Sequence, residues 1–178
     1  MYDSQDTLKG DIPMFEAQDI TRRVARVLLE RPTAYAAIRG SAPYSAVRGT
    51  VYFFQTRGDV IIAAEVSGLP HLSGPCMNGV FAFHIHEGGG CLGDRQDRYA
   101  GAGGHYNPKK CPHPYHAGDM PPLFENSGSA FLTFITDRFQ VSEVIGRSVI
   151  IHAGVDDFTS QPSGNSGKKI ACGTIMAM

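Results

Sequence analysis

The sequence predicts an all-β fold of short antiparallel strands arranged as a sandwich or barrel, and three features of its composition favour this fold. The 178 residues include 21 glycines and 11 prolines, and such frequent chain breakers favour many turns between short strands. Charged residues make up only 19% of the chain, which is low for a surface rich in helices. Hydrophobic residues make up 42%, which argues against disorder and is enough for one domain with a buried core.

Eight segments have the composition of strands. Apolar and β-branched residues alternate or run together in them, and glycine, proline or short polar turns separate them. The expected strands are residues 33–40, 47–55, 60–66, 80–87, a short segment around Leu123, 130–136, 148–152 and 169–176.

Two long polar segments, residues 88–120 and 156–168, interrupt this pattern. Neither has hydrophobic periodicity, and a structureless segment as long as the first is uncommon in a compact domain unless it is functional. We therefore expect these loops to carry the function while the strands form the scaffold.

The segment 16–31 has a different pattern, with Ile20, Val24 and Val27 at helical spacing before Pro32. This spacing predicts one short amphipathic helix that ends at the proline. We expect the apolar stripe to pack on the surface of the domain. A helix that binds a partner or a membrane surface is the alternative, because Arg22, Arg23 and Arg26 lie between the apolar residues.

These patterns divide the chain into an N-terminal extension, residues 1–31, and a β-domain, residues 32–178. The net charge of −1 is not that of a typical nucleic-acid-binding protein. No run of 18 apolar residues predicts a membrane span, and no basic segment followed by an apolar run predicts a secretory signal. We therefore expect a cytoplasmic protein without nucleic-acid or membrane partners, or an exported one if the chain is a processed form.

The seven histidines carry the strongest functional signal. His84 and His86 lie two apart on an expected strand, so their side chains share a face and can bind one metal ion. His113, His116 and Asp119 lie within seven residues of a loop, which suits a zinc site with nitrogen and oxygen ligands.

Two further histidines extend this pattern, since His105 lies eight residues before His113 and His152 ends an apolar strand. A single histidine in a strand is more often a hydrogen-bonded polar residue than a metal ligand. The combination of these motifs favours metal binding, because it includes six of the seven histidines.

The segments around these histidines resemble one family, the copper–zinc superoxide dismutases. The resemblance extends from about residue 33 to the C-terminus. It implies an eight-stranded Greek-key sandwich or barrel, an architecture of which this family is an established example. The matching segments are FHIHE (83–87), GGHYNP (103–108), HPYHAGD (113–119), GRSVIIHAGVDD (146–157) and SGNSGKKIACGTI (163–175).

The resemblance also implies which residues bind metal. His105 matches the imidazole that bridges the two metals and takes part in proton delivery during catalysis. The residues that match the copper ligands are His84, His86, His105 and His152. The residues that match the zinc ligands are His105, His113, His116 and Asp119.

Further residues match the family around the metals. Asp156 matches the carboxylate that links a copper ligand to a zinc ligand, and capping of a turn is its alternative role. Cys91 and Cys172 match the family's intrasubunit disulfide. Lys169 matches the position of an arginine that guides the anionic substrate. Lysine keeps the charge but lacks the planar fork of donors, and a solvated charge at a strand start is the other interpretation.

Cys76 and Cys111 have no counterpart in the resemblance. They are predicted either to remain free thiols or to form a second disulfide that holds the loop, because a sequence contains no geometry with which to decide.

The sequence thus predicts a superoxide dismutase with copper and zinc as cofactors, superoxide anion as substrate and a homodimer as an open alternative to a monomer. A second hypothesis is a non-catalytic protein that holds zinc alone or buffers copper on the same fold. A third is a structural or partner-binding domain, but this hypothesis leaves six histidines unexplained.

Overall fold

The computed structural model describes residues 14–71, 74 and 79–178, and the chain divides into two compact units, Met1–Glu30 and Arg31–Met178. The first unit contains helix α1 (Met14–Val27). This helix ends earlier than the sequence predicts. Its backbone tightens beyond Val27, where the Glu30 amide donates to the Val27 carbonyl, well before Pro32. No helix among the described residues combines the length and apolar character needed to cross a bilayer.

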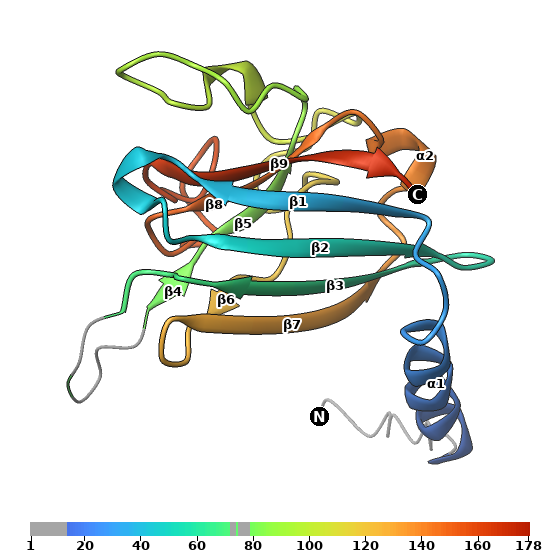
Figure 1. The fold of residues 1–178 in the computed structure, drawn as a ribbon. Coiled ribbons are helices and arrows are strands. Elements are labelled where there is room, and N and C mark those ends of the chain that lie inside the picture. The colour runs from blue at the N-terminus through green and yellow to red at the C-terminus, as the bar shows by residue number, and fades with distance from the viewer. Residues whose placement is uncertain (1–13, 72–73, 75–78) are drawn as a thin grey trace, which may run out of the picture. The chain divides into compact units, whose positions relative to one another are not determined.

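The second unit is built from antiparallel strands, as predicted. Seven strands form one curled sheet in the order β5-β8-β9-β1-β2-β3-β7, and β4 pairs with β6 in a small second sheet (Figure 1). Neighbours such as β3 and β7, or β5 and β8, are distant in sequence, as Greek-key connections require. The strands are β1 (Ala34–Gly40), β2 (Arg48–Gln55), β3 (Val60–Ser67), β4 (Val80–Phe81), β5 (Phe83–His86), β6 (Leu123–Phe124), β7 (Ser129–Thr136), β8 (Ser148–His152) and β9 (Lys169–Ala177).

The described residues form nine strands where the sequence predicts eight, because the expected strand at residues 80–87 is divided at Ala82. Its backbone N–H donates to the Gly154 carbonyl, and its carbonyl accepts from the His152 amide, beyond the regular ladder of β8. The chain before Ala82 pairs with β6 as β4, whereas the chain after it pairs with β8 as β5. This division separates the segment that carries the histidines from the small sheet.

The hydrophobic core lies on the concave side of the large sheet. Alternate residues of β1, such as Ala34, Ala36 and Ile38, are fully buried, and so are Val149 and Ile151 of β8. This alternation follows from the strand period of two, which sends successive side chains to opposite faces. The other face of β8 is therefore free to carry the functional residues.

A second, smaller cluster covers that other face. Ile150 packs there with Tyr99 and Ala102 of the long loop, and the disulfide between Cys91 and Cys172 ties the same loop to β9. The predicted disulfide is thus confirmed. Cys111 is a free thiol, and Cys76 lies outside the described residues.

The long loop contains no strand or α-helix between residues 88 and 120, as predicted. Its regular element is the short 3-10 helix η2 (Ala100–Ala102). A second 3-10 helix, η1 (Ala42–Tyr44), joins β1 to β2. One turn of helix, α2 (Val141–Val144), precedes β8 and begins with a capping box between Gln140 and Glu143.

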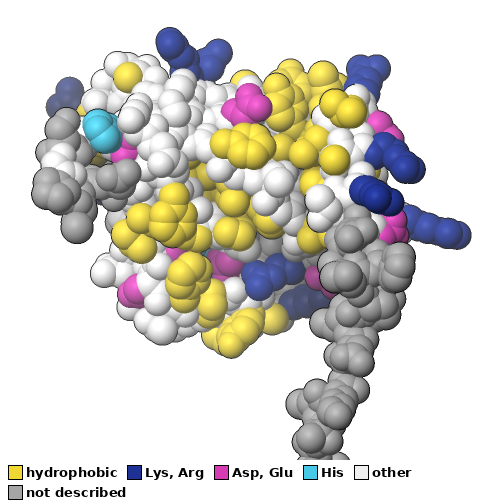
Figure 2. Space-filling model, turned by 90° about the horizontal axis from the view of Figure 1, so that it is seen from below, with side chains coloured by type: hydrophobic (Ala, Val, Ile, Leu, Met, Phe, Trp, Pro, Cys, Tyr) yellow, Lys and Arg dark blue, Asp and Glu magenta, His cyan; other side chains and the backbone are white. Residues whose placement is uncertain are grey.

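Exposed apolar side chains lie on β7, an edge strand of the large sheet, and on β6 of the small sheet. Phe124 of β6 and Phe131 and Ile135 of β7 are exposed. Hydrophobic side chains gather over the face of the molecule seen in Figure 2.

Candidate metal centre

Three histidines are brought together by the pairing of β5 with β8. His84 lies opposite Ile150 in the antiparallel register, so His152, two residues further along β8, lies on the same face. His86 lies two residues beyond His84 on β5 and shares this face as well. Ile85, between His84 and His86, faces the core, which is why histidine and isoleucine alternate in β5.

The long loop adds the fourth histidine. His105 forms an isolated antiparallel bridge with His86, and the backbones on either side bond to β5, where the Tyr106 amide donates to the Ile85 carbonyl. The ligand nitrogens of His84, His86, His105 and His152 all lie within 4.8 Å of one another. The four predicted copper ligands thus form one buried cluster, which we call the four-histidine cluster.

Hydrogen bonds at the outer nitrogens fix the tautomers of this cluster. His86 Nδ1 lies 2.9 Å from the Gly103 carbonyl oxygen and His152 Nδ1 lies 3.3 Å from that of Gly167. Because a carbonyl only accepts, each Nδ1 carries the proton and each Nε2 presents a lone pair. The two Nε2 atoms lie only 3.1 Å apart, and a cation between them relieves the repulsion of their lone pairs. Neutral imidazole nitrogens of this kind suit copper.

A second cluster adjoins the first and consists of His105, His113, His116 and Asp119, whose ligand atoms also lie within 4.8 Å of one another. The Asp119 carboxylate lies 2.7 Å from His105 Nδ1, 3.1 Å from His113 Nδ1 and 3.3 Å from His116 Nδ1. Three imidazole nitrogens around one carboxylate match the tetrahedral nitrogen and oxygen site that zinc prefers. We call this group the three-histidine–aspartate cluster.

Unpaired ring nitrogens show where cations fit. Among the described residues, the buried side-chain atoms without a hydrogen-bond partner are His84 Nδ1, His105 Nε2 and His113 Nδ1. Leaving a buried polar atom unsatisfied is costly, so each of these nitrogens calls for a partner. All three belong to residues of the two clusters, and copper and zinc would complete them.

His105 is the residue that the two clusters share. Its Nδ1 faces Asp119 and His116, at 2.7 Å and 3.4 Å, while its Nε2 is one of the unpaired nitrogens. One ring therefore offers a nitrogen to each cluster, which is the geometry of a bridging imidazole.

Asp156 joins the clusters from behind. Its two oxygens lie 2.8 Å from His84 Nε2 and 2.8 Å from His113 Nε2. The carboxylate accepts from both rings, which directs Nδ1 of each ring towards its own cluster. Gly164 leaves room for this contact, because a Cβ there would lie 1.9 Å from Asp156 Oδ1, and its φ of +65° also favours glycine.

Burial keeps the rings neutral. Loss of hydration, together with the charge of neighbouring rings, lowers the pKa of His86 to about 2 and that of His152 to about 3. Burial also lowers the pKa of His84 and His116. Burial opposes ionisation of Asp156, but hydrogen bonds from His84, the Phe158 amide and His113 outweigh it and lower the pKa of this carboxyl. Both effects prepare the ligands for cations, because metals bind unprotonated imidazole and carboxylate.

Lys169 lies beside His152 of the four-histidine cluster. It is opposite His152 in the pairing of β8 with β9, at an irregularity in the ladder. Its ammonium group is 2.7 Å from Asp97 Oδ2 and 3.2 Å from the Tyr99 carbonyl oxygen. The lysine is thus held by the long loop, and Asp97 offsets part of its charge.

Sequence reasoning did not find four residues that shape the site, namely Asp97, Arg138, Gln161 and Gly164. The side-chain amide of Gln161 exchanges hydrogen bonds with the backbone of His113, and Arg138 bonds the loop of His116 and Asp119. Gly164 had a signal, since it lies in a matched segment next to glycine-rich sequence. The other three had none, because their partners are distant in sequence.

Comparison with known proteins agrees with this geometry. The model of the family described as copper/zinc superoxide dismutase (SODC) matches residues 47–175. The chain belongs to the copper/zinc superoxide dismutase family.

Several bacterial family members resemble the chain at a similar level. It is 37% identical to Cu-Zn superoxide dismutase 2 of Aquifex aeolicus over 131 residues, which cover 65% of this chain and 71% of that protein. It is 35% identical to the Cu-Zn superoxide dismutase of Deinococcus radiodurans over 135 residues, 66% of this chain and 70% of that protein. The chain is therefore a member of the family, and both ligand sets predicted from the sequence are present in it as two adjoining clusters.

Replacing the linking carboxylate should weaken both metal sites. In Asp156→Asn the amide has one acceptor oxygen and no charge, so one of the two rings loses its partner and the bond to the other ring is no longer charge-assisted. We expect the affinities for copper and zinc each to fall by about 10–100-fold, measured by competition with chelators. The control is Asp157→Asn, whose carboxylate bonds Thr159 and Ser160 in its own turn. Equal effects of the two variants would contradict the role given to Asp156.

Acid should destabilise the metal-free protein. Below pH about 6.5, His86 and His152 bind protons in the unfolded chain but not in the folded one, because their pKa values in the folded protein are about 2 and about 3. The free energy of unfolding therefore falls as the pH decreases from 6.5 to 5. Once the pH is well below the pKa of the unfolded histidines, each of the two contributes a slope of about 1.4 kcal/mol per pH unit.

Guanidinium unfolding after chelation of metals, at several pH values, measures this slope. The double variant His86→Gln/His152→Gln removes both groups and should show a shallower slope. A slope unchanged in that variant would show that other groups cause the acid sensitivity.

Proposed function

We propose that this protein catalyses the dismutation of superoxide, in which two superoxide anions and two protons give dioxygen and hydrogen peroxide. The observation that carries the proposal is His105, one ring with a nitrogen in each of the two clusters. A protein that held zinc alone would need only the three-histidine–aspartate cluster. The complete second cluster, with four neutral imidazoles, favours the enzyme over the non-catalytic alternatives.

The cofactors divide the chemistry between the clusters. Copper supplies one-electron chemistry by alternating between two oxidation states, whereas zinc keeps one oxidation state and holds its side of the bridge. His84, His86, His105 and His152 would hold copper, and His105, His113, His116 and Asp119 would hold zinc.

His105 is the residue that handles protons. Its Nδ1 is held on the side of Asp119, while its Nε2 has no hydrogen-bond partner and faces the four-histidine cluster. The His105 side chain is buried, at 3% exposure, and Nε2 is itself a buried atom. Because no hydrogen bond occupies this nitrogen, it can take up a proton and pass it to the reduced substrate.

The substrate is a small anion, and Lys169 is placed to attract it. The lysine side chain is only 14% exposed and its ammonium group is held by Asp97 and the Tyr99 carbonyl. This fixes the charge in one position beside His152. The negative charge of Asp97 weakens the long-range attraction of Lys169 for the anion, but its hydrogen bond orients the ammonium group near the cluster.

Loss of one histidine should abolish the activity. His152→Ala removes a ligand of the four-histidine cluster and leaves the other cluster intact, so protein loaded with both metals should lose most of its dismutase activity while zinc stays bound. The control is His71→Ala, which removes the one histidine outside both clusters. A His152→Ala protein as active as the control would refute the assignment of this cluster.

Reversing the charge of Lys169 should slow the reaction. Repulsion in Lys169→Glu is expected to lower kcat/KM about 10-fold or more at low salt, because steering of anions acts at this scale, and superoxide dismutases are an established example of it. The difference should shrink with added salt. Lys168→Glu is the matched control, since it places the same charge at the exposed neighbour. If the two variants react equally fast, Lys169 has no special place in guiding the substrate.

A further inference from the structure

Arg138 joins the large sheet to the loop of the three-histidine–aspartate cluster. It follows the end of β7, where its amide donates to Thr136 Oγ1 at 3.2 Å. The next residue, Phe139, is buried in the core at 3% exposure. The backbone of Arg138 is thus fixed to the scaffold, while its side chain extends towards the loop.

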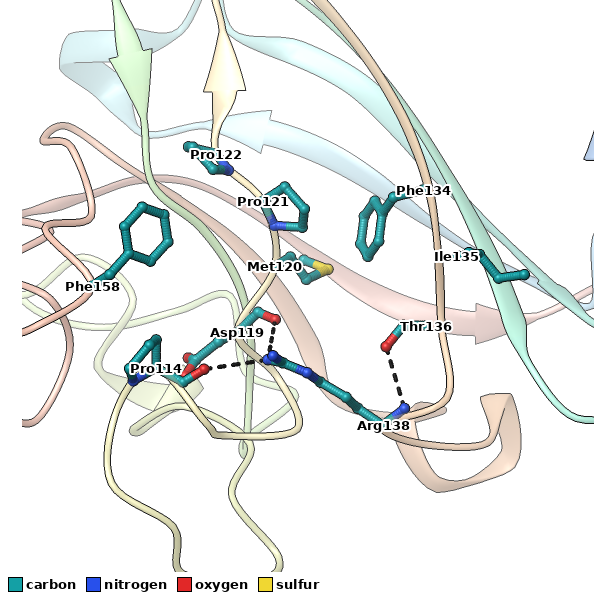
Figure 3. Close-up of a pocket in the computed structure, with 10 residues that line it drawn as sticks. All are labelled: Pro114, Asp119, Met120, Pro121, Pro122, Phe134, Ile135, Thr136, Arg138 and Phe158. Carbon is teal, nitrogen blue, oxygen red and sulfur yellow. Dashed lines mark hydrogen bonds between the residues drawn. The ribbon is translucent and has the colours of Figure 1, made fainter. Parts of the chain in front are cut away.

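One terminal nitrogen of the guanidinium group meets three backbone carbonyls of that loop. Arg138 Nη1 lies 3.3 Å from the Pro114 oxygen, 3.2 Å from the His116 oxygen and 3.2 Å from the Asp119 oxygen. Figure 3 shows the side chain running from Thr136 towards Pro114 and Asp119. Carbonyl dipoles that converge in this way repel one another unless a cation lies between them.

The three carbonyls enclose the part of the loop that carries metal ligands. His116 and Asp119 each give their side chain to the cluster and their carbonyl oxygen to Arg138. Other bonds hold neighbouring residues. Gln161 bonds the backbone of His113, and the Gly118 amide, between His116 and Asp119, donates to the Tyr106 carbonyl. Arg138 differs from these anchors because it is a cation that bonds the carbonyls of both ligand residues, His116 and Asp119.

We propose that Arg138 is a positioning residue of the zinc site, which sets the turn of His116 and Asp119 in its binding conformation before the metal arrives. The proposal rests on the zinc site given above. A cation at this place does not compete with zinc for the ligands, because it binds backbone oxygens whereas the cluster consists of side-chain atoms. Its effect is to reduce the ordering that zinc binding requires.

The affinity for zinc tests this role. Arg138→Gln should weaken zinc binding by about 10-fold or more, as for other residues that orient metal ligands, in competition with a chromophoric chelator. Arg138→Lys should restore most of the affinity, because an ammonium group has three donors for the three carbonyls. The control is Arg57→Gln, in the exposed turn between β2 and β3. An unchanged affinity in Arg138→Gln, or a lysine variant as weak as the glutamine variant, would overturn the proposal.

Hydrogen exchange of the metal-free proteins separates positioning from general stability. Amides of residues 115–119 should lose protection in Arg138→Gln, while those of β1, β2 and β3 keep it. Cobalt bound in place of zinc should show altered absorption bands in the same variant. A glutamine variant that fails to fold, or that loses protection equally throughout the sheet, overturns the proposal in favour of a structural role. If wild-type protein and His116→Ala bind zinc equally, the zinc site itself is refuted instead.

Discussion

In four of the imidazoles a hydrogen bond holds one ring nitrogen, and this leaves the other nitrogen facing its cluster. Gly103 and Gly167 carbonyls hold His86 and His152, and the carboxylate of Asp156 holds His84 and His113. These bonds decide which nitrogen keeps the proton and which way the ring faces. Without them the rings could turn or exchange tautomers, and burial alone would leave lone pairs and protons in no defined order.

The β scaffold supplies the fixed points for these bonds. The register of β5 against β8 places three histidines on one face, and the core on the opposite face prevents a slip of one residue, which would exchange histidine for isoleucine in the core. The long loop has little regular structure, so its position comes from attachments to the sheet: the disulfide at Cys91, Arg138, and the backbone bonds to β5. Rigid strands thus carry three of the seven ligands, and an anchored loop carries the other four.

The strands and the fold class could be predicted from the sequence because their signals are local. Short spacing also marks part of each ligand set, whereas the complete sets, with His105 and His152, followed from the resemblance to the family. Alternation marks the strands, and HxH or HxxHxxD places ligands on one face or in one turn. The division of the strand at Ala82 could not be predicted, since it depends on hydrogen bonds to the chain after β8. Asp97 and Arg138 were missed for a related reason. Their residue types are common on protein surfaces, and they act through partners about 20 to 70 positions away in the sequence.

Asp156 and His105 each touch both clusters, and this gives the two metals a thermodynamic connection. A cation in one cluster fixes a ring, or a carboxylate that holds a ring, needed by the other, so the ordering is already complete when the second ion binds. Binding free energies around such a cycle must close, and the factor by which zinc strengthens copper binding equals the factor by which copper strengthens zinc binding. Ions bound at the two clusters would therefore each strengthen the binding of the other through the shared ring and carboxylate.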